Sequence, residues 1–538
     1  MECGPTRGVC QDMGLPLRSL FIALALVFSF LPLSLAQSAP LLERGTAVTD
    51  PVALRELDRG PFSLARMLSA SPSSDKPLAD DALFALSAIA GIRKSLDEEF
   101  ERYVQRHKVE LPNETIGVGP QFDFQLFDRD QLYSQATRFV LSGIVNRMDR
   151  AFVAPRSCGE IRLIYRLTEI DAPPVGDHGA SARLPMTLNL VLKAKADKAI
   201  DAKDAALTCA TIARRWLESG DGPATGAALA EKLASEGGPL ASIGPENIER
   251  IETNLQIAHV SQSPGHEFRT DYLLKVFDYN PQAKVFEEAT LEDQIDRERL
   301  LSDKKLRRDF KAWLLDPAHL KEFDRGTVLI PKEFLAKTAI APTPIGFAAS
   351  PSQPAFGLVQ GEGENPLFST DDVVTALQKA AARGIILQNI RSVAGFERRL
   401  NDITCAGCHQ TRGIGGFHFP GVDWMAAHPS NTLIVPASPH FFGDQVRRRE
   451  ILSEIRDGKT VDYSRGFSER PQLRGSGELA GTEYDDGWGA HCYGLRDKVG
   501  DKAADNDRSF VSWSCAKGLA CQVMSEASRM GMCFVGNR

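Results

Sequence analysis

Two cysteines and a histidine in the last third of the chain have the spacing of a covalent cofactor site. Residues 405–409 read Cys-Ala-Gly-Cys-His. Thiols at this spacing can each form a thioether with one of the two vinyl groups of a single haem. The imidazole that follows can then bind the iron as the proximal ligand. The pattern predicts one haem c (iron) attached through Cys405 and Cys408, with His409 on the metal.

The sixth ligand of such an iron is left open by the motif. The downstream candidates are His418, Met425, His428 and His440. A histidine would give bis-imidazole iron suited to electron transfer, and Met425 would raise the potential. With no distal ligand, the iron could bind peroxide or a gas. We rank His440, in a Pro-His-Phe-Phe run at 439–442, and His418 slightly above Met425.

An apolar run near the N-terminus indicates export. Leu20–Leu33 has the length of the hydrophobic part of a signal peptide, and Arg18 precedes it. Ser34 and Ala36 are small residues at the two positions that a signal peptidase reads, so we expect residues 1–36 to be removed. An uncleaved anchor is the alternative, although the run is short for a membrane span. The expected location is periplasmic or secreted, on the side of the membrane where haem c is attached.

The cysteines divide evenly, as expected of an exported protein. Cys3 and Cys10 lie in the segment predicted to be removed. Cys158 and Cys209 are predicted to form a disulfide in an oxidising compartment. With the pair at 405 and 408 assigned to the cofactor, four cysteines remain, and they allow three pairings. These four, in a predicted Cys-rich module at 476–538, are Cys492, Cys515, Cys521 and Cys533. A metal site built from them is the alternative, which an oxidising compartment disfavours.

Composition and charge exclude some classes of protein. Hydrophobic residues make up 43% and charged residues 25% of the chain, which is ordinary for a soluble globular protein. The net charge of -7 argues against nucleic acid or an anionic membrane as the main partner, and membrane association is not required. We find no nucleotide-binding loop, hydrolase elbow or HExxH motif in residues 111–336. The role of that region is therefore not evident from its motifs.

Hydrophobic periodicity predicts an α+β fold with a mainly antiparallel sheet. Apolar and polar residues alternate at 161–167 and 186–192, the period of strands with one buried face. Further strands are expected at 122–127, 137–145, 254–260 and 272–279, and helices at about 78–107, 202–218, 223–236 and 290–314. We expect one α+β domain at 111–336, after a helical lead-in at 37–110.

The C-terminal half is predicted to be divided by a linker. Prolines and glycines accumulate at 337–367, which indicates an irregular connection. Ser369 supplies an N-cap for a helix that extends to about Arg383. A second helix at about 388–400 leads into Cys405, and a third is expected at 444–455. Residues 368–475 would then form a small helical haem-binding region.

Thr404–Gln410 and the flanking helices resemble the c-type cytochromes. In the monohaem branch of that family, a proline shortly after the proximal histidine accepts a hydrogen bond from the imidazole. The resemblance implies that Pro420 does this for His409 and fixes its tautomer. It covers only the haem segment, and it departs from the family pattern because no methionine lies between Met425 and Met524. The arginines at 447–449 can either reach a haem propionate or only decorate their helix.

Two classes of function remain. The first is an exported monohaem c-type cytochrome-like protein, with a redox partner protein, that acts in electron transfer or redox chemistry. Whether it is an enzyme is left open, because a peroxidase needs an open iron face and a distal acid–base group. The second is a secreted binding or structural protein in which Cys405 and Cys408 form a disulfide. A thiol–disulfide enzyme is disfavoured, because its cysteine pair normally starts a helix, whereas here helix-like residues precede the pair.

Overall fold

The computed structural model describes most of the chain between Glu43 and Val535. The described residues are 43–69, 78–110, 112, 114–116, 127–170, 183–197, 207–261, 269–343, 367–405, 444–466, 491–493, 515, 518–523 and 530–535. The predicted signal peptide at 1–36 and the strand predicted at 122–127, except for its last residue, lie outside them. So do residues 406–443, which follow the first cysteine of the haem motif.

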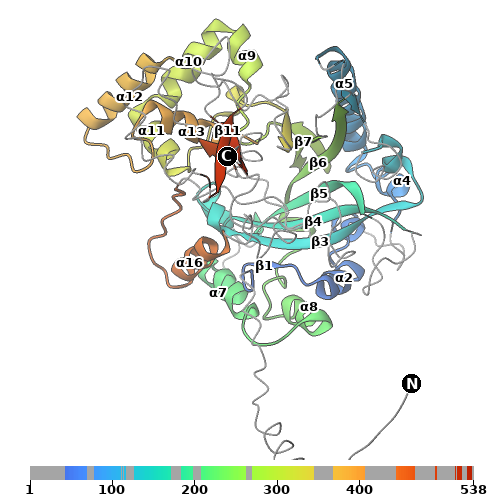
Figure 1. Cartoon of the computed structure of the whole chain (residues 1–538). Coiled ribbons are helices and arrows are strands. Elements are labelled where there is room, and N and C mark those ends of the chain that lie inside the picture. Colours follow the sequence, from blue (N-terminus) through green and yellow to red (C-terminus); the bar gives the residue numbers. More distant parts are fainter. Residues whose placement is uncertain are drawn as a thin grey trace, which may run out of the picture. The chain divides into compact units, whose positions relative to one another are not determined.

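A nine-stranded sheet is the largest element of the described residues (Figure 1). In spatial order its main path is β1 (Ala47–Val48), β3 (Thr137–Arg147), β4 (Glu160–Glu169), β5 (Arg183–Lys193), β6 (Ile248–Ser261), β7 (Arg269–Asn280) and β8 (Val285–Ala289). Two further strands are β2 (Glu114–Ile116), which pairs with β6, and β9 (Thr338–Thr343), which pairs with β7. Every pairing is antiparallel. The α+β class with a mainly antiparallel sheet is therefore confirmed.

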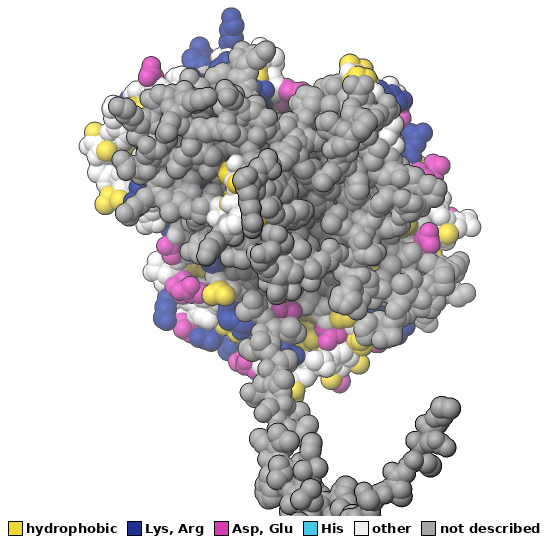
Figure 2. Space-filling model, viewed as in Figure 1, with side chains coloured by type: hydrophobic (Ala, Val, Ile, Leu, Met, Phe, Trp, Pro, Cys, Tyr) yellow, Lys and Arg dark blue, Asp and Glu magenta, His cyan; other side chains and the backbone are white. Residues whose placement is uncertain are grey.

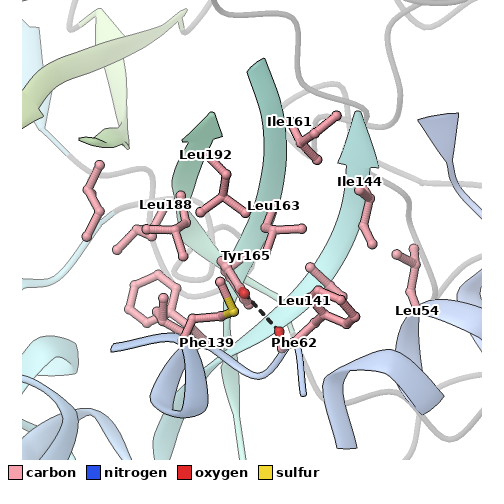
Figure 3. Packing of buried hydrophobic residues seen from close by; sticks show 14 of the residues in the cluster. Leu54, Phe62, Phe139, Leu141, Ile144, Ile161, Leu163, Tyr165, Leu188 and Leu192 are labelled. Atoms are coloured by element: carbon pink, nitrogen blue, oxygen red, sulfur yellow. Dashed lines mark hydrogen bonds between the residues drawn. The ribbon is translucent and has the colours of Figure 1, made fainter. Parts of the chain in front are cut away.

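Helices cover one face of this sheet, and that face is apolar. The helices are α2 (Pro51–Arg59), α3 (Leu64–Leu68), α4 (Asp80–Leu83), α5 (Ala90–Glu110), α7 (Cys209–Ser219) and α8 (Gly226–Ala234). Figure 3 shows Leu54 and Phe62 packed against Leu141 and Leu163, with Tyr165 in the centre. The hydroxyl of Tyr165 donates a hydrogen bond to the carbonyl oxygen of Phe62 at 2.8 Å. This one polar atom of the ring is thus satisfied inside the core.

A second hydrophobic core is made by helices from both sides of the predicted linker. These helices are α9 (Arg297–Ser302), α10 (Lys304–Leu314), α11 (Pro317–Arg325), α12 (Thr370–Ala382) and α13 (Val393–Ile403). Phe368 stands 5.8 Å from Phe310 and 5.2 Å from Phe396, measured between ring centroids. The packing does not follow the domain division predicted at 337–367, because proline and glycine content does not show which helices share a core.

The predicted linker itself begins with a strand. Thr338–Thr343 is β9, and its register places Ala339 opposite Leu274 and Ala341 opposite Tyr272. Among the described strands, β9 pairs only with β7. Pro342, which has no N–H to donate, is tolerated at such an edge. Residues 344–366 lie outside the described residues.

The remaining described elements follow the two cores. The helix α16 (Gln445–Arg456) packs on α7 and on the 3-10 turn η3 (Met148–Arg150). A small antiparallel sheet consists of β10 (His491–Tyr493), β11 (Leu519–Val523) and β12 (Met530–Val535). Among the described helices, none has the length and apolar character that crossing a membrane requires.

The cysteines were partly predicted. Cys158 and Cys209 form a disulfide with a Cα–Cα distance of 5.3 Å, which confirms that pairing. Cys515 and Cys521 are each disulfide-bonded as well. The C-terminal segment therefore uses at least these two of its four cysteines as bridges, as expected where a segment has little core of its own.

Two predicted helices are broken, and each break has a local cause. The helix expected at 78–107 becomes α4 and α5, with turns between them. The helix expected at 290–314 becomes α9 and α10. Asp303 separates them, because its carboxylate accepts the backbone N–H groups of Lys305 and Leu306 and so caps a new helix.

Candidate functional site

Cys405 lies two residues beyond α13 and is buried against β7 and β9. Only 2% of the residue is exposed. It shares an apolar cluster with Tyr272, Leu274, Val276, Leu291, Ala339 and Ala341. Its backbone N–H donates to Oε1 of Gln294 at 3.1 Å. The first cysteine of the motif is thus held firmly on the sheet.

The helix that leads to Cys405 is anchored in the second core. Phe396, Leu400 and Ile403 recur at helical spacing on α13 and are buried there. Arg399 on the same helix is fully buried, and its Nη2 donates to the carbonyl oxygens of Asp324 and Arg465 at 2.8 and 2.7 Å. Burial lowers the pKa of Arg399 to about 10, and the neighbouring carboxylates oppose that shift. Cys405 therefore follows a helix of the second core and lies in a separate apolar cluster on β7 and β9.

The sheet face that contacts Cys405 is polar over much of its width, although it is buried. On β4–β6 the residues that alternate with the apolar ones are Arg162, Arg166, Thr187, Asn189, Glu252, Asn254 and Gln256. Each of them is 4% exposed or less. The helices named above that cover the sheet belong to the cluster on its opposite face. Such a buried polar face needs internal partners or a bound molecule.

One end of the polar face holds a closed network of charges. Glu160 is 2.9 Å from Arg162, 2.9 Å from Arg250 and 3.4 Å from Arg150. Glu252 is 3.1 Å from Arg162 and 3.0 Å from Arg250. Burial favours the neutral acid, but Arg250, Arg150 and Arg162 hold the pKa of Glu160 well below its usual value. The carboxylate of Glu160 therefore stays ionised.

The same network reaches the loop that contacts Cys405. Arg150 also pairs with Glu292, which precedes Gln294 by two residues. Asp293 between them has a positive φ of 64°, and its Oδ1 is buried with no hydrogen-bond partner among the described residues. Burial, followed by the charge of Glu292, raises the pKa of Asp293 well above its usual value. The raised pKa favours the protonated form of this carboxyl group, which is the form that can donate a proton.

A second charged cluster involves the arginines that were considered as propionate ligands. Asp149 lies 2.8 Å from Arg147 and 2.7 Å from Arg447. Asp444 binds Arg447, Arg448 and Arg465 at 2.9, 2.7 and 3.0 Å. Arg449 donates to the carbonyl oxygen of Arg44. Arg447 and Arg448 thus form internal ion pairs instead of decorating the surface of their helix.

A cavity of about 140 Å³ lies beside the disulfide. Its lining consists of Met148, Ala151, Phe152, Pro155, Cys158, Cys209, Ile455 and Tyr463. The rings of Phe152 and Tyr463 are 5.7 Å apart. The lining residues that the structure describes are apolar and bring no nucleophile or acid–base pair together.

Of the residues predicted to form the haem site, the structure places only Cys405. Cys408, His409, His418, Pro420, Met425, His428 and His440 lie outside the described residues. Within the described part of the chain, no group of three or more His, Cys, Asp or Glu side chains could hold a metal ion. The ligation of the iron stays a prediction. Comparison with family models, curated proteins and solved structures finds no match to this chain.

Sequence reasoning missed Asp293, Gln294 and the polar face. Gln294 reaches Cys405 across 111 residues of sequence, so no local pattern indicates this contact. The polar face did leave a signal. Asn189, Glu252 and Asn254 occupy strand interiors, where residues of these types are uncommon.

On the side seen in Figure 2, exposed Lys and Arg side chains of the described residues occur together with Asp and Glu. Among the residues that the structure describes, no extended field of one sign is visible on that side.

Proposed function

We propose that the chain is an exported monohaem c-type cytochrome-like protein that acts in electron transfer or redox chemistry outside the cytoplasm. The observation that carries the proposal is the Cys-Ala-Gly-Cys-His run at 405–409, whose first thiol packs on the sheet. Cys405 and Cys408 would hold haem c by thioethers, and His409 would bind the iron. The iron would supply one-electron redox chemistry.

The surroundings of Cys405 fit the edge of a porphyrin. Leu274, Val276 and Leu291 offer apolar contacts, and Tyr272 adds an aromatic ring. Ala339 and Ala341 have small side chains, so β9 adds little bulk beside the sulfur. The contact from Gln294 holds the backbone at the attachment point. These residues would bind and orient one edge of the ring and keep water from it.

The alternative is a secreted binding or structural protein with a Cys405–Cys408 disulfide. The raised pKa of Asp293, the residue before Gln294, favours redox chemistry that consumes protons.

Haem staining after denaturing electrophoresis tests the proposal directly. The full chain would be expressed in a host that matures c-type cytochromes and then compared with Cys405→Ser and Cys408→Ser. We expect a stained band for the parent chain, and weakened or absent staining for both variants. Thr404→Ser, next to the motif, is the matched control and should stain normally. A colourless parent band at the full mass would refute the proposal.

Axial ligation is tested by absorption and electron-resonance spectra of the purified protein. His409→Ala should lose the proximal ligand, and Pro420→Ala should alter the spectrum by freeing the imidazole tautomer. Among His440→Ala, His418→Ala and Met425→Ala, the variant that changes the spin state identifies the distal ligand. If none of them does, five-coordinate iron is supported.

A further inference from the structure

The cavity beside the disulfide is lined by described residues from four parts of the chain, and it has room for a small molecule. Its volume is about 140 Å³. The four parts are η3 with the loop after it, the first residue of α7, the last turn of α16, and the segment that follows α16. Phe152, Ile455 and Tyr463 are half-buried and Pro155 is exposed. The cavity therefore opens to solvent, and a ligand can enter without unfolding the protein.

The walls of the cavity are held in place by cross-links. The disulfide between Cys158 and Cys209 joins the loop to α7. Asp149 of η3 forms ion pairs with Arg147 at 2.8 Å and with Arg447 of α16 at 2.7 Å. An empty cavity destabilises a fold, because the atoms that line it lose packing contacts. Walls that are cross-linked in this way cannot collapse to recover those contacts, whereas a ligand can supply them.

The backbone at the disulfide is strained, and the strain keeps one wall against η3. Cys158 has a φ of 60°, a left-handed conformation that residues other than glycine rarely adopt. Gly159 follows with a φ of 87°, and a Cβ atom there would lie 2.7 Å from the Cα atom of Met148. Only glycine allows the loop to pass η3 so closely. Strained backbone of this kind concentrates at binding sites, where the surrounding structure enforces it.

The chemistry of the lining selects the class of ligand. None of the described lining residues carries a charge, so an ionised ligand would lose its hydration without gaining a partner. Met148 and the disulfide contribute sulfur atoms to the wall. Phe152 and Tyr463 contribute two rings, whose centroids are 5.7 Å apart. Sulfur atoms and aromatic rings attract another aromatic ring beyond the effect of buried area.

The volume sets the size of the ligand. An apolar cavity of about 150 Å³ in a protein stays dry and binds benzene, because water finds no polar partners there. The cavity beside the disulfide is of nearly the same volume and is similarly apolar. We infer that it binds one small, uncharged aromatic molecule with a single ring.

Calorimetric titration of the full-length exported protein with toluene tests the inference. Cyclohexane serves as a saturated ring of similar size, and benzoate as a charged aromatic one. We expect one toluene to bind per chain, cyclohexane to bind about threefold more weakly or worse, and benzoate not to bind. Toluene should also raise the melting temperature, since it binds only the folded chain. If toluene does not bind, or binds as several weak copies per chain, the inference is wrong.

Ala151→Leu tests the position of the site, because Ala151 is buried and lines the cavity. The larger side chain should occupy the space and weaken toluene binding about tenfold or more. Ala154→Leu is the matched control, because Ala154 lies in the same loop outside the lining. It should bind toluene like the parent chain. Equal affinities for the two variants would contradict the inference.

Tyr463→Leu is a second variant, at a half-buried position where loss of folding is not expected. It removes one aromatic wall and should reduce the preference for toluene over cyclohexane. Tyr463→Phe keeps the ring and should bind toluene like the parent chain. A preference that is unchanged in Tyr463→Leu would show that toluene binds elsewhere.

Cys405→Ser separates this inference from the proposed function, on which it does not depend. No described lining residue belongs to the motif at 405–409 or to the cluster around Cys405. This variant should therefore bind toluene like the parent chain, whether or not the parent chain contains haem. A haem-containing parent chain that does not bind toluene would refute this inference alone, and a colourless one that binds it would refute the proposed function alone.

Discussion

The two faces of the central sheet are equally buried but chemically opposite. On one face Leu163, Tyr165 and Leu188 pack under helices, and each is fully buried. Burial of such apolar area stabilises a fold by about 25 cal/mol per Å². On the other face Asn189 and Glu252 are buried to nearly the same degree. Burying polar groups does not stabilise the fold in this way, because it removes them from water. The apolar face therefore explains the stability of the fold, and the polar face points to function.

The largest expected contrast between the faces is in pH dependence. Asp80, in α4 on the helical side, is fully buried, and burial raises its pKa to about 8. The unfolded chain loses this proton near pH 3.8, whereas the folded chain keeps it until about pH 8. The contribution of Asp80 to the free energy of unfolding is therefore fully present below pH 3.8 and is lost as the pH rises through 8. The total loss is about 5 kcal/mol.

Asp80→Asn should abolish that loss. We expect the variant to melt well above the parent chain at about pH 9 and to gain little at about pH 5. Asp58, whose pKa burial raises to about 6, adds a smaller loss of the same sign at lower pH. If the melting temperatures of the parent chain and the variant differed by the same amount at both pH values, the assignment would be contradicted.

Glu160 on the polar face should behave in the opposite way. Its lowered pKa means that its stabilisation is present above the unfolded pKa and disappears as the pH falls. Glu160→Gln removes the carboxylate shared by Arg150, Arg162 and Arg250. We expect a loss of about 3–5 kcal/mol in denaturant unfolding, because buried guanidinium groups are left unpaired.

Glu218→Gln is the control for that measurement. Glu218 pairs with Arg214 at 3.0 Å, but both side chains are about half exposed. Exposed pairs contribute about 0–1 kcal/mol. Equal losses of unfolding free energy for the two variants would show that the network on the polar face stabilises the fold no more than an exposed ion pair does.

The smallest effect should come from a polar contact within the apolar core. Tyr165→Phe removes the hydrogen bond to the carbonyl oxygen of Phe62 and keeps the ring. A loss of about 1 kcal/mol is expected in denaturant unfolding. Leu188→Ala on the same face should cost about 2–5 kcal/mol through its cavity. If the two variants were equal, the core would depend on that hydrogen bond and not on packing.

The alternation of apolar and polar residues predicted where the strands lie. It did not predict that the polar side chains of these strands are buried. Residues 161–167 and 186–192 lie in β4 and β5 as expected. A period of two also predicted that Arg162 and Asn189 lie on the face opposite the core. It could not show that this face is buried, because the pattern is the same for solvent and for a polar interior.

Contacts distant in sequence account for the other differences. Cys158 and Cys209 could be paired from compartment and count, because few alternatives existed. The packing of α9–α11 with α12 and α13 depends on aromatic rings that meet across the linker segment. Of the candidate site, only the position of Cys405 can be compared, and its contact with Gln294 had no local signal.

The burial of one sulfur has a consequence for biogenesis. In the finished fold Cys405 is 2% exposed, which leaves no room for an assembly enzyme to reach it. If haem c is attached there, the bond must form on the nascent, still open polypeptide, before the strands β7 and β9 close around it. Maturation would then set the order of folding, and a chain that folded too early would be trapped without its cofactor.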